Sequence, residues 1–186
     1  MEYLAAKLTQ RCLRFGFIDA PQEEWCQYTL QTYITNVGGF LILIAFGIFL
    51  SPWPQVLILN LGVAFLRSKC GGLHMPTASS CFLISLLFES ICLLALPHLT
   101  FGISLFLLLV SLAGLFCLAP CNNDAIHCDG DELKKMREAV LIRLILAVFT
   151  ILVLFLCIPG YAYPLVLSNV VVMVSVALSK LGFGIQ

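Results

Sequence analysis

Charged side chains are scarce in this sequence. Only 11% of its 186 residues are Asp, Glu, Lys or Arg, and the acids and bases balance at ten each. That is too little charge for a water-soluble surface, and no positive excess remains to bind nucleic acid. In contrast, 61% of the residues are hydrophobic and the mean hydropathy is +1.03. These proportions indicate an integral membrane protein, because one soluble core could not bury so many apolar side chains.

The first 27 residues lack the uninterrupted apolar core and the small-residue cleavage site of a secretory signal. Four apolar residues recur there at helical spacing, namely Leu4, Leu8, Cys12 and Phe15. Basic residues occupy the remaining face of that helix. We therefore expect residues 1–27 to form a cytoplasmic amphipathic helix at the membrane interface. Residues 28–186 would then form the membrane domain.

Six apolar runs approach the roughly 20 residues that a helix needs to cross the hydrocarbon region. They are Tyr28–Leu50, Trp53–Leu66, Thr77–Leu96, Leu99–Ala119, Ala139–Ile158 and Tyr161–Ser179. The second run has only 14 residues, which leaves three alternatives: it extends into its flanks, it is partly re-entrant, or it is not a span. The sequence thus predicts an all-α membrane protein with about six transmembrane helices.

The basic residues predict how these spans are oriented. The connections Ser51–Pro52, Pro97–His98 and Pro159–Gly160 contain no Lys or Arg, and all ten fall in the other connections, near the termini or at the start of the fifth run. Positive charge in short loops is retained on the cytoplasmic side of a membrane. Both termini and the two longer loops are therefore expected in the cytoplasm.

The nine cysteines contain no CxxC pair. Most lie in spans or in loops expected in the reducing cytoplasm, so disulfides are not expected, and Cys92 and Cys157 read as small apolar residues inside helices. Soft ligands for zinc occur in two sets. One is Cys70, His74 and Cys81, and the other is Cys117, Cys121, His127 and Cys128. Neither set has the paired CxxC spacing of a typical zinc site, which argues against both. We expect neither a metal nor a cofactor.

One histidine and one cysteine flank a turn at the mouth of the third span. Gly71 and Gly72 permit an abrupt turn, and Pro76 suits the first position of a helix. His74 and Cys81 would stand about 10.5 Å apart on one continuous helix, so His74 must leave the helix to reach the thiol. An imidazole that accepts the thiol proton generates the reactive thiolate. The pair is therefore a candidate base and nucleophile.

The remaining catalytic groups are less well defined. Glu89 lies about 12 Å along the helix axis from Cys81, so an interhelical polar or packing contact is expected of it rather than a hydrogen bond to His74. Asp124 in the second cytoplasmic loop is an alternative group to orient the histidine. Oxyanion donors could come from the backbone amides of Gly71 and Gly72 or from the side chain of Ser80.

Two functions of other classes fit the composition. In a small transporter or channel, intramembrane polar residues would line a pathway, here Glu89, Asn60 and Asn169. A membrane scaffold without enzymatic activity is the other alternative. A neighbouring gene for a peptide with an amphipathic leader, a central cysteine and an acidic tail is required only if the protein is a peptidase.

The spacing Arg-x3-Gly-Gly-x-His-x6-Cys, within about 190 residues and six spans, resembles the AgrB family of membrane cysteine endopeptidases from bacterial quorum sensing. The residues that carry it are Arg67, Gly71, Gly72, His74 and Cys81. The loop 118–124, followed by a Lys-Lys pair, is similar to the second cytoplasmic loop of that family. Two features depart from the family pattern: Met75 replaces a residue that is often small, and no proline follows Asp124.

This resemblance implies a bacterial cell-membrane enzyme, plausibly acting as a homodimer, that cleaves an AgrD-like propeptide at the cytoplasmic face. Cys81 would be the nucleophile and His74 the proton acceptor, and a nucleophile within the peptide would capture the thioester to give a cyclic thiolactone. Five basic residues would form a cytoplasmic surface suited to an acidic peptide tail: Arg67, Lys69, Lys134, Lys135 and Arg137. The same charges are suited to anionic membrane lipids.

Overall fold

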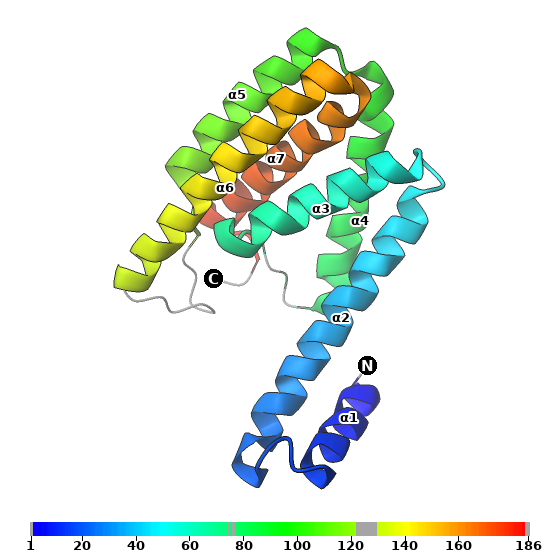
Figure 1. Ribbon diagram of the computed structural model, residues 1–186, viewed down its shortest axis with the longest axis vertical. Coiled ribbons are helices and arrows are strands. Elements are labelled where there is room, and N and C mark those ends of the chain that lie inside the picture. The colour runs from blue at the N-terminus through cyan, green and yellow to red at the C-terminus, as the bar shows by residue number, and fades with distance from the viewer. Residues whose placement is uncertain (1, 74, 76, 122–129, 185–186) are drawn as a thin grey trace. The chain divides into compact units, whose positions relative to one another are not determined.

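The computed structural model describes residues 2–73, 75, 77–121 and 130–184. These residues form seven α-helices and two short 3-10 helices, and they contain no strand (Figure 1). The helices are α1 (Glu2–Arg14), η1 (Ala20–Gln22), α2 (Glu23–Gly47), α3 (Trp53–Cys70), α4 (Ala78–Ala95), η2 (Leu96–His98), α5 (Phe101–Leu118), α6 (Gly130–Cys157) and α7 (Pro159–Lys180). The chain divides within α2 into two compact units, Met1–Leu43 and Ile44–Gln186. The predicted all-α architecture is confirmed.

The first unit contains α1, η1 and most of α2. The small side chains Ala5 and Thr9 are the buried residues on the described part of α1, and Cys26 is buried on α2. Leu4 and Phe15, two members of the predicted apolar stripe, remain exposed at 49% and 71% of their surface. A helix is thus present over Glu2–Arg14, shorter than the expected 1–27, and its place at a membrane interface stays a prediction.

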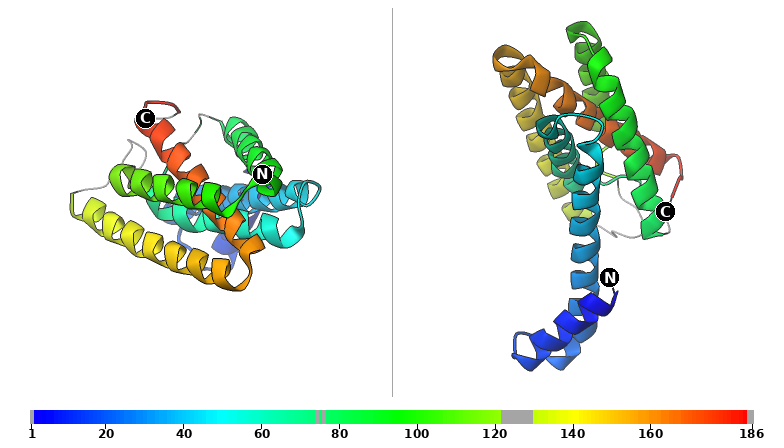
Figure 2. Two further views of the ribbon diagram at one scale, coloured as in Figure 1. Left: turned by 90° about the horizontal axis from the view of Figure 1, so that it is seen from above. Right: turned by 90° about the vertical axis from the view of Figure 1, so that its right-hand side faces the viewer.

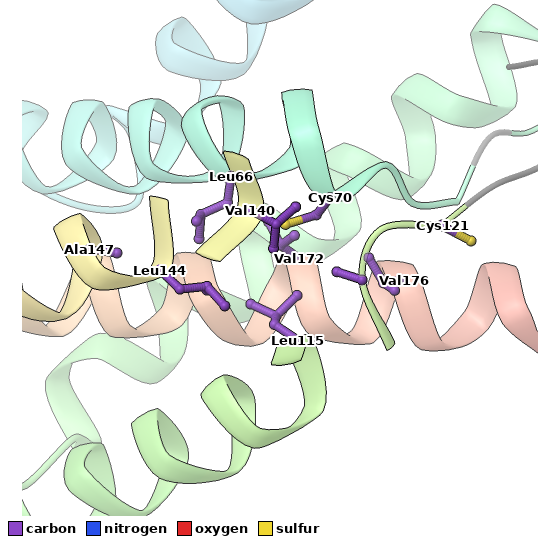
Figure 3. Packing of buried hydrophobic residues seen from close by; sticks show 10 residues of the cluster. Leu66, Cys70, Leu115, Cys121, Val140, Leu144, Ala147, Val172 and Val176 are labelled. Carbon is purple, nitrogen blue, oxygen red and sulfur yellow. The ribbon is translucent and has the colours of Figure 1, made fainter. Parts of the chain in front are cut away.

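The second unit is organised around α7, which packs against α3, α4, α5 and α6. Side chains of α3, α5 and α6 meet those of α7 in one buried cluster, among them Leu66, Leu115, Leu144 and Val172 (Figure 3). Lipid tails are as apolar as these side chains, so helices in a membrane gain little from leaving lipid. Close van der Waals packing around α7 is therefore what stabilises this unit.

Glycines allow two of these helices to approach α7 closely. A side chain at Gly62 of α3 would collide with Ser168 of α7, and a Cβ at Gly114 of α5 would lie 2.6 Å from the Met173 side chain. Small residues at helix interfaces serve this purpose in membrane proteins, because they let two backbones come near each other. The two glycines thus explain how α7 can be covered on several sides.

The helices agree closely with the six expected apolar runs. Within the described residues, five helical segments are long and apolar enough to cross a membrane, and they include α2, α4, α5, α6 and α7. The second expected span corresponds to α3, which continues four residues past Leu66 to Cys70. This helix is not among the five segments, since Asn60, Arg67 and Lys69 lower the mean hydropathy of its 18 residues. The predicted extension of this short run into its flank is confirmed at its C-terminal end.

Candidate active site

Cys81 lies in the first turn of α4. Thr77 caps this helix: its hydroxyl oxygen accepts a hydrogen bond from the Ser80 amide at 3.2 Å, and its carbonyl accepts one from the Cys81 amide at 3.1 Å. The helix begins at Ala78, close to the expected start at Pro76, which itself lies outside the described residues.

Cys81 is also more accessible than Cys70, at the end of α3, and Cys92, later on α4. It is half-buried, whereas Cys70 and Cys92 retain 0% and 6% of their exposed surface. The Cys70 thiol at the end of α3 is fully enclosed by its neighbours, so a substrate cannot contact it. Cys70 is thus unsuited to act as a nucleophile, and Cys81 is reachable by a substrate.

The turn before His74 requires both of its glycines. Gly71 and Gly72 have φ angles of +72° and +140°, a backbone region that other L-residues rarely adopt. A Cβ at Gly71 would lie 3.1 Å from the Cys121 carbonyl oxygen, and a Cβ at Gly72 would lie 2.5 Å from the Ser175 hydroxyl oxygen. Conformation and space therefore both exclude a side chain here.

Three hydrogen bonds hold this turn in place. The Arg67 guanidinium donates to the Leu73 carbonyl at 2.6 Å, and the Leu73 amide donates to the Ser175 hydroxyl at 2.9 Å. In addition, the Cys121 amide donates to the Cys70 carbonyl at 2.9 Å. Groups from α3, from α7 and from the segment after α5 thus fix the chain up to the residue before His74.

The structure therefore brings together three of the predicted site residues, Arg67, Gly71 and Gly72, in one turn. Ser80 lies in the first turn of α4, where its hydroxyl donates to the Thr77 carbonyl at 2.9 Å. His74 lies outside the described residues, so its pairing with Cys81 stays a prediction. The same holds for roles predicted for residues in the segment 122–129, which contains Asp124, His127 and Cys128.

Sequence reasoning missed Ser175 and Cys121 as supports of the turn. A serine within an otherwise apolar helix was the available signal for Ser175, but it gives no hint of a partner 102 positions away in the chain. Arg143 was also missed as a structural residue. Its guanidinium donates to the Phe65 carbonyl and the Ser68 hydroxyl and lies 4.9 Å from the Phe65 ring centroid, which ties α6 to the end of α3.

The predicted basic surface is mixed in charge where α6 begins. Lys134, Lys135 and Arg137 are exposed there, and Lys69 is exposed in the last turn of α3. The same two turns of α6 also contain three acids, Asp131, Glu132 and Glu138. The segment 131–138 therefore has three basic and three acidic residues and no net charge. Arg67 is engaged with the turn. Any attraction for an acidic peptide must therefore come from local pairing rather than from a large net charge.

Of the described residues, no group of three or more His, Cys, Asp or Glu is placed to hold a metal. Each of the two zinc ligand sets considered from the sequence contains residues outside the described ranges. The polar residues Asn60 and Glu89 bond to each other, with the Asn60 side-chain nitrogen 2.7 Å from a Glu89 oxygen. The interhelical contact expected of Glu89 is thus present.

The family model described as "AgrB: Accessory gene regulator B" matches residues 1–181, nearly the whole chain. The chain belongs to the AgrB family. It is also 30% identical over 101 residues to an AgrB-like protein from Clostridium beijerinckii, a match that covers 53% of this chain and 51% of that relative. The match thus spans about half the length of the curated relative. No solved structure matches the chain.

Family membership agrees with the five helical segments of the described residues that are long and apolar enough to cross a membrane. Leu73 is the last described residue before His74, and its contacts with Arg67 and Ser175 fix the chain up to that point.

We predict that Gly72→Ala disrupts the turn, because its Cβ would meet the Ser175 hydroxyl at 2.5 Å and its φ is positive. The expected loss is about 1–3 kcal/mol of unfolding free energy, together with propeptide processing. Thermal unfolding in detergent and a processing assay measure the two effects. Gly16→Ala is the matched control, since Gly16 shares a positive φ but has nothing within 4 Å. Equal effects of the two substitutions would show that the Ser175 contact is unimportant.

Proposed function

We propose that this AgrB family member is a membrane-embedded cysteine endopeptidase that cleaves a small AgrD-like propeptide at the cytoplasmic face. The observation that carries the proposal is the placement of Cys81. This half-buried cysteine stands in the first turn of α4, just after a turn that Arg67 and Ser175 hold in place. Rigid support on one side and an accessible thiol on the other is the arrangement that nucleophilic catalysis needs.

In the proposed reaction, His74 accepts the proton of the Cys81 thiol, and the thiolate attacks the carbonyl carbon of the scissile peptide bond. The carbon–nitrogen bond then breaks, and His74 returns the proton to the departing amine. The acyl group remains on Cys81 as a thioester. Backbone amides of the Gly71-Gly72 turn are candidates to stabilise the oxyanion that forms on the way.

The second half of the reaction closes a ring. A thiol within the bound peptide attacks the thioester carbonyl, the bond to Cys81 breaks, and Cys81 recovers a proton as the cyclic thiolactone leaves. Water competes for the same thioester. A site at the membrane interface lowers the local concentration of water, and binding of the peptide raises the effective concentration of its thiol. Both effects favour cyclisation over hydrolysis.

Cys81→Ala should abolish cleavage of the propeptide and leave the protein inserted in the membrane, because the substitution removes the nucleophile and alters a half-buried position. His74→Ala should act nearly as strongly, since an unassisted thiol with a pKa of about 8.5 is mostly protonated at neutral pH. Mass spectrometry of enzyme with propeptide should detect an adduct on Cys81 that hydroxylamine releases.

Cys92→Ala is the matched control, because Cys92 lies on the same helix but is buried in a packing cluster. It should retain cleavage. Full activity of Cys81→Ala would falsify the mechanism. Activity that depends on zinc and is lost to a chelator would instead assign the chemistry to a metal.

The propeptide tail gives a second test. We propose that Lys69, Lys134, Lys135 and Arg137 pair with acidic residues of the peptide tail, as charge complementarity favours. The double variant Lys134→Glu/Lys135→Glu should raise the KM for propeptide severalfold, and reversal of the tail acids to Lys should restore part of the loss. Kinetics at two salt concentrations measure this effect, which screening should weaken. An unchanged KM across the whole set would leave these residues with a role in membrane topology alone.

We further propose that both termini and the active-site turn face the cytoplasm, and that the enzyme acts as a homodimer in a bacterial cell membrane. The orientation is supported by the distribution of the basic residues. Cys70 cannot report on it, because this residue is fully buried. Exposed positions are needed instead, and Lys69 and His98 satisfy this requirement on opposite sides of the proposed topology.

In a cysteine-free background, we expect Lys69→Cys to resist a membrane-impermeant thiol reagent added outside intact cells. His98→Cys should react with it, because the connection after α4 is proposed to face outward. Permeabilised cells provide the control, since both positions should then react. Labelling of Lys69→Cys in intact cells would overturn the orientation.

A further inference from the structure

Only the second half of α4 is buried in this unit. Its buried residues are Glu89, Cys92 and Leu93, and none of the described residues 79–88 is buried. Cys92 and Leu93 belong to a cluster with residues of α3 and α7, such as Val56 and Leu167. Figure 2 shows that the start of α4 stands apart from α7. The first half of α4, with Cys81, is thus held in position from the second half.

Glu89 marks the point where this packing begins. The Asn60 side-chain amide of α3 donates to a Glu89 oxygen at 2.7 Å and to the Val56 carbonyl at 3.0 Å, so the amide is oriented by its own helix. Both side chains are buried, with 8% of Asn60 and 5% of Glu89 exposed. A polar contact in such a place meets no competing water and keeps two apolar helices in one register.

A third helix completes the surroundings of the carboxyl group. A Cβ at Gly47, the last residue of α2, would lie 2.7 Å from the bonded Glu89 oxygen and 2.6 Å from the Val56 side chain. The absence of a side chain at Gly47 therefore leaves the room that the carboxyl group occupies. The helices α2, α3 and α4 thus meet where Asn60 and Glu89 bond, and Gly47 of α2 leaves space for that contact.

We propose that Glu89 is a positioning residue for the peptidase reaction, because its bond to Asn60 sets the direction of α4 and thereby the place of Cys81. This inference rests on the proposed function. Cys81 is about 12 Å along the helix axis from Glu89, so a tilt of about 5° at the junction moves it by about 1 Å. A displacement of that size at a reacting atom can cost roughly a hundredfold in rate.

The role requires the shape and hydrogen bonding of the side chain rather than its charge. Among the described residues, no Lys or Arg is bonded to Glu89, so nothing there would compensate a negative charge. The oxygen of a glutamine side chain can accept the same bond from Asn60. Leucine fills similar space and cannot accept it. Glu89→Gln removes the charge and keeps the hydrogen bond, whereas Glu89→Leu removes both, so the two variants separate the effect of the charge from that of the bond.

The kinetic test compares these variants per molecule of membrane-inserted enzyme. Glu89→Leu should lower kcat by roughly three- to a hundredfold and leave KM within about twofold. Glu89→Gln should stay within about twofold of wild type. Asn60→Leu should repeat the loss, and the double variant should add little to it, because both changes break one bond. If the Glu89→Leu protein does not accumulate in the membrane, Asn60→Leu tests the same hydrogen bond from the other side.

Ser90→Ala is the matched control, since Ser90 is the next residue on α4 and its hydroxyl donates to the Leu86 carbonyl of the same helix at 2.7 Å. It should leave kcat unchanged. A loss of activity in Glu89→Gln with normal helix positions would show that the charge is required and would overturn the proposal. So would full kcat in both Glu89→Leu and Asn60→Leu.

A second measurement follows the helix without any catalysis. In a cysteine-free background, spin labels at the exposed positions Leu83 of α4 and Ile142 of α6 report the distance between these helices by pulsed EPR. Glu89→Leu should shift or broaden the distance distribution, and Glu89→Gln should reproduce that of the parent. Identical distributions in all three would overturn the proposal. If wild-type enzyme cleaves no propeptide, the peptidase proposal fails separately, and the distances still decide whether Glu89 anchors α4.

Discussion

The buried hydrogen bond between the Leu73 amide and the Ser175 hydroxyl connects the functional turn to the central helix of the bundle. A buried amide without a partner would cost about 1–3 kcal/mol, so α7 stabilises the turn at a position where water cannot replace it. The bond also explains why Gly72 has no side chain, since a Cβ there would displace the hydroxyl. The packing around α7 and the geometry of the turn therefore depend on each other through the hydrogen bond between Leu73 and Ser175.

The two halves of the candidate site are supported very differently. Contacts from α3, α7 and the segment after α5 hold the turn before His74, and they leave it little freedom. Cys81 lies on a half-helix without buried residues in its described part. The turn is thus firmly held, whereas the helix that carries Cys81 is less constrained. The direction of that helix then matters for catalysis, which is why the Asn60–Glu89 contact is of interest.

Polar side chains are used sparingly throughout the second unit. Arg67, Arg143 and Ser175 each bond to backbone groups where a helix ends or a turn begins. Such groups cannot be left to water at the edge of a hydrocarbon layer, because each unpaired one costs free energy. Two of the ten basic residues thus have structural tasks in addition to any effect on topology, and the basic surface available to a substrate is smaller than the sequence suggests.

The fold class, the approximate places of the apolar helices and the family all follow from the sequence, whereas exact helix boundaries do not: α6 begins at Gly130, nine residues before the expected run. Apolar runs of membrane-spanning length, together with the spacing from Arg67 to Cys81, are local signals that need no knowledge of contacts. Tertiary structure alone decided that Arg67 serves the turn, that Cys70 is buried, and that Glu89 bonds to Asn60. It also assigned Ser175 to Leu73, a partner 102 positions away. Such pairings depend on which faces of separate helices meet, and in a membrane almost every face is apolar, so hydropathy cannot distinguish them.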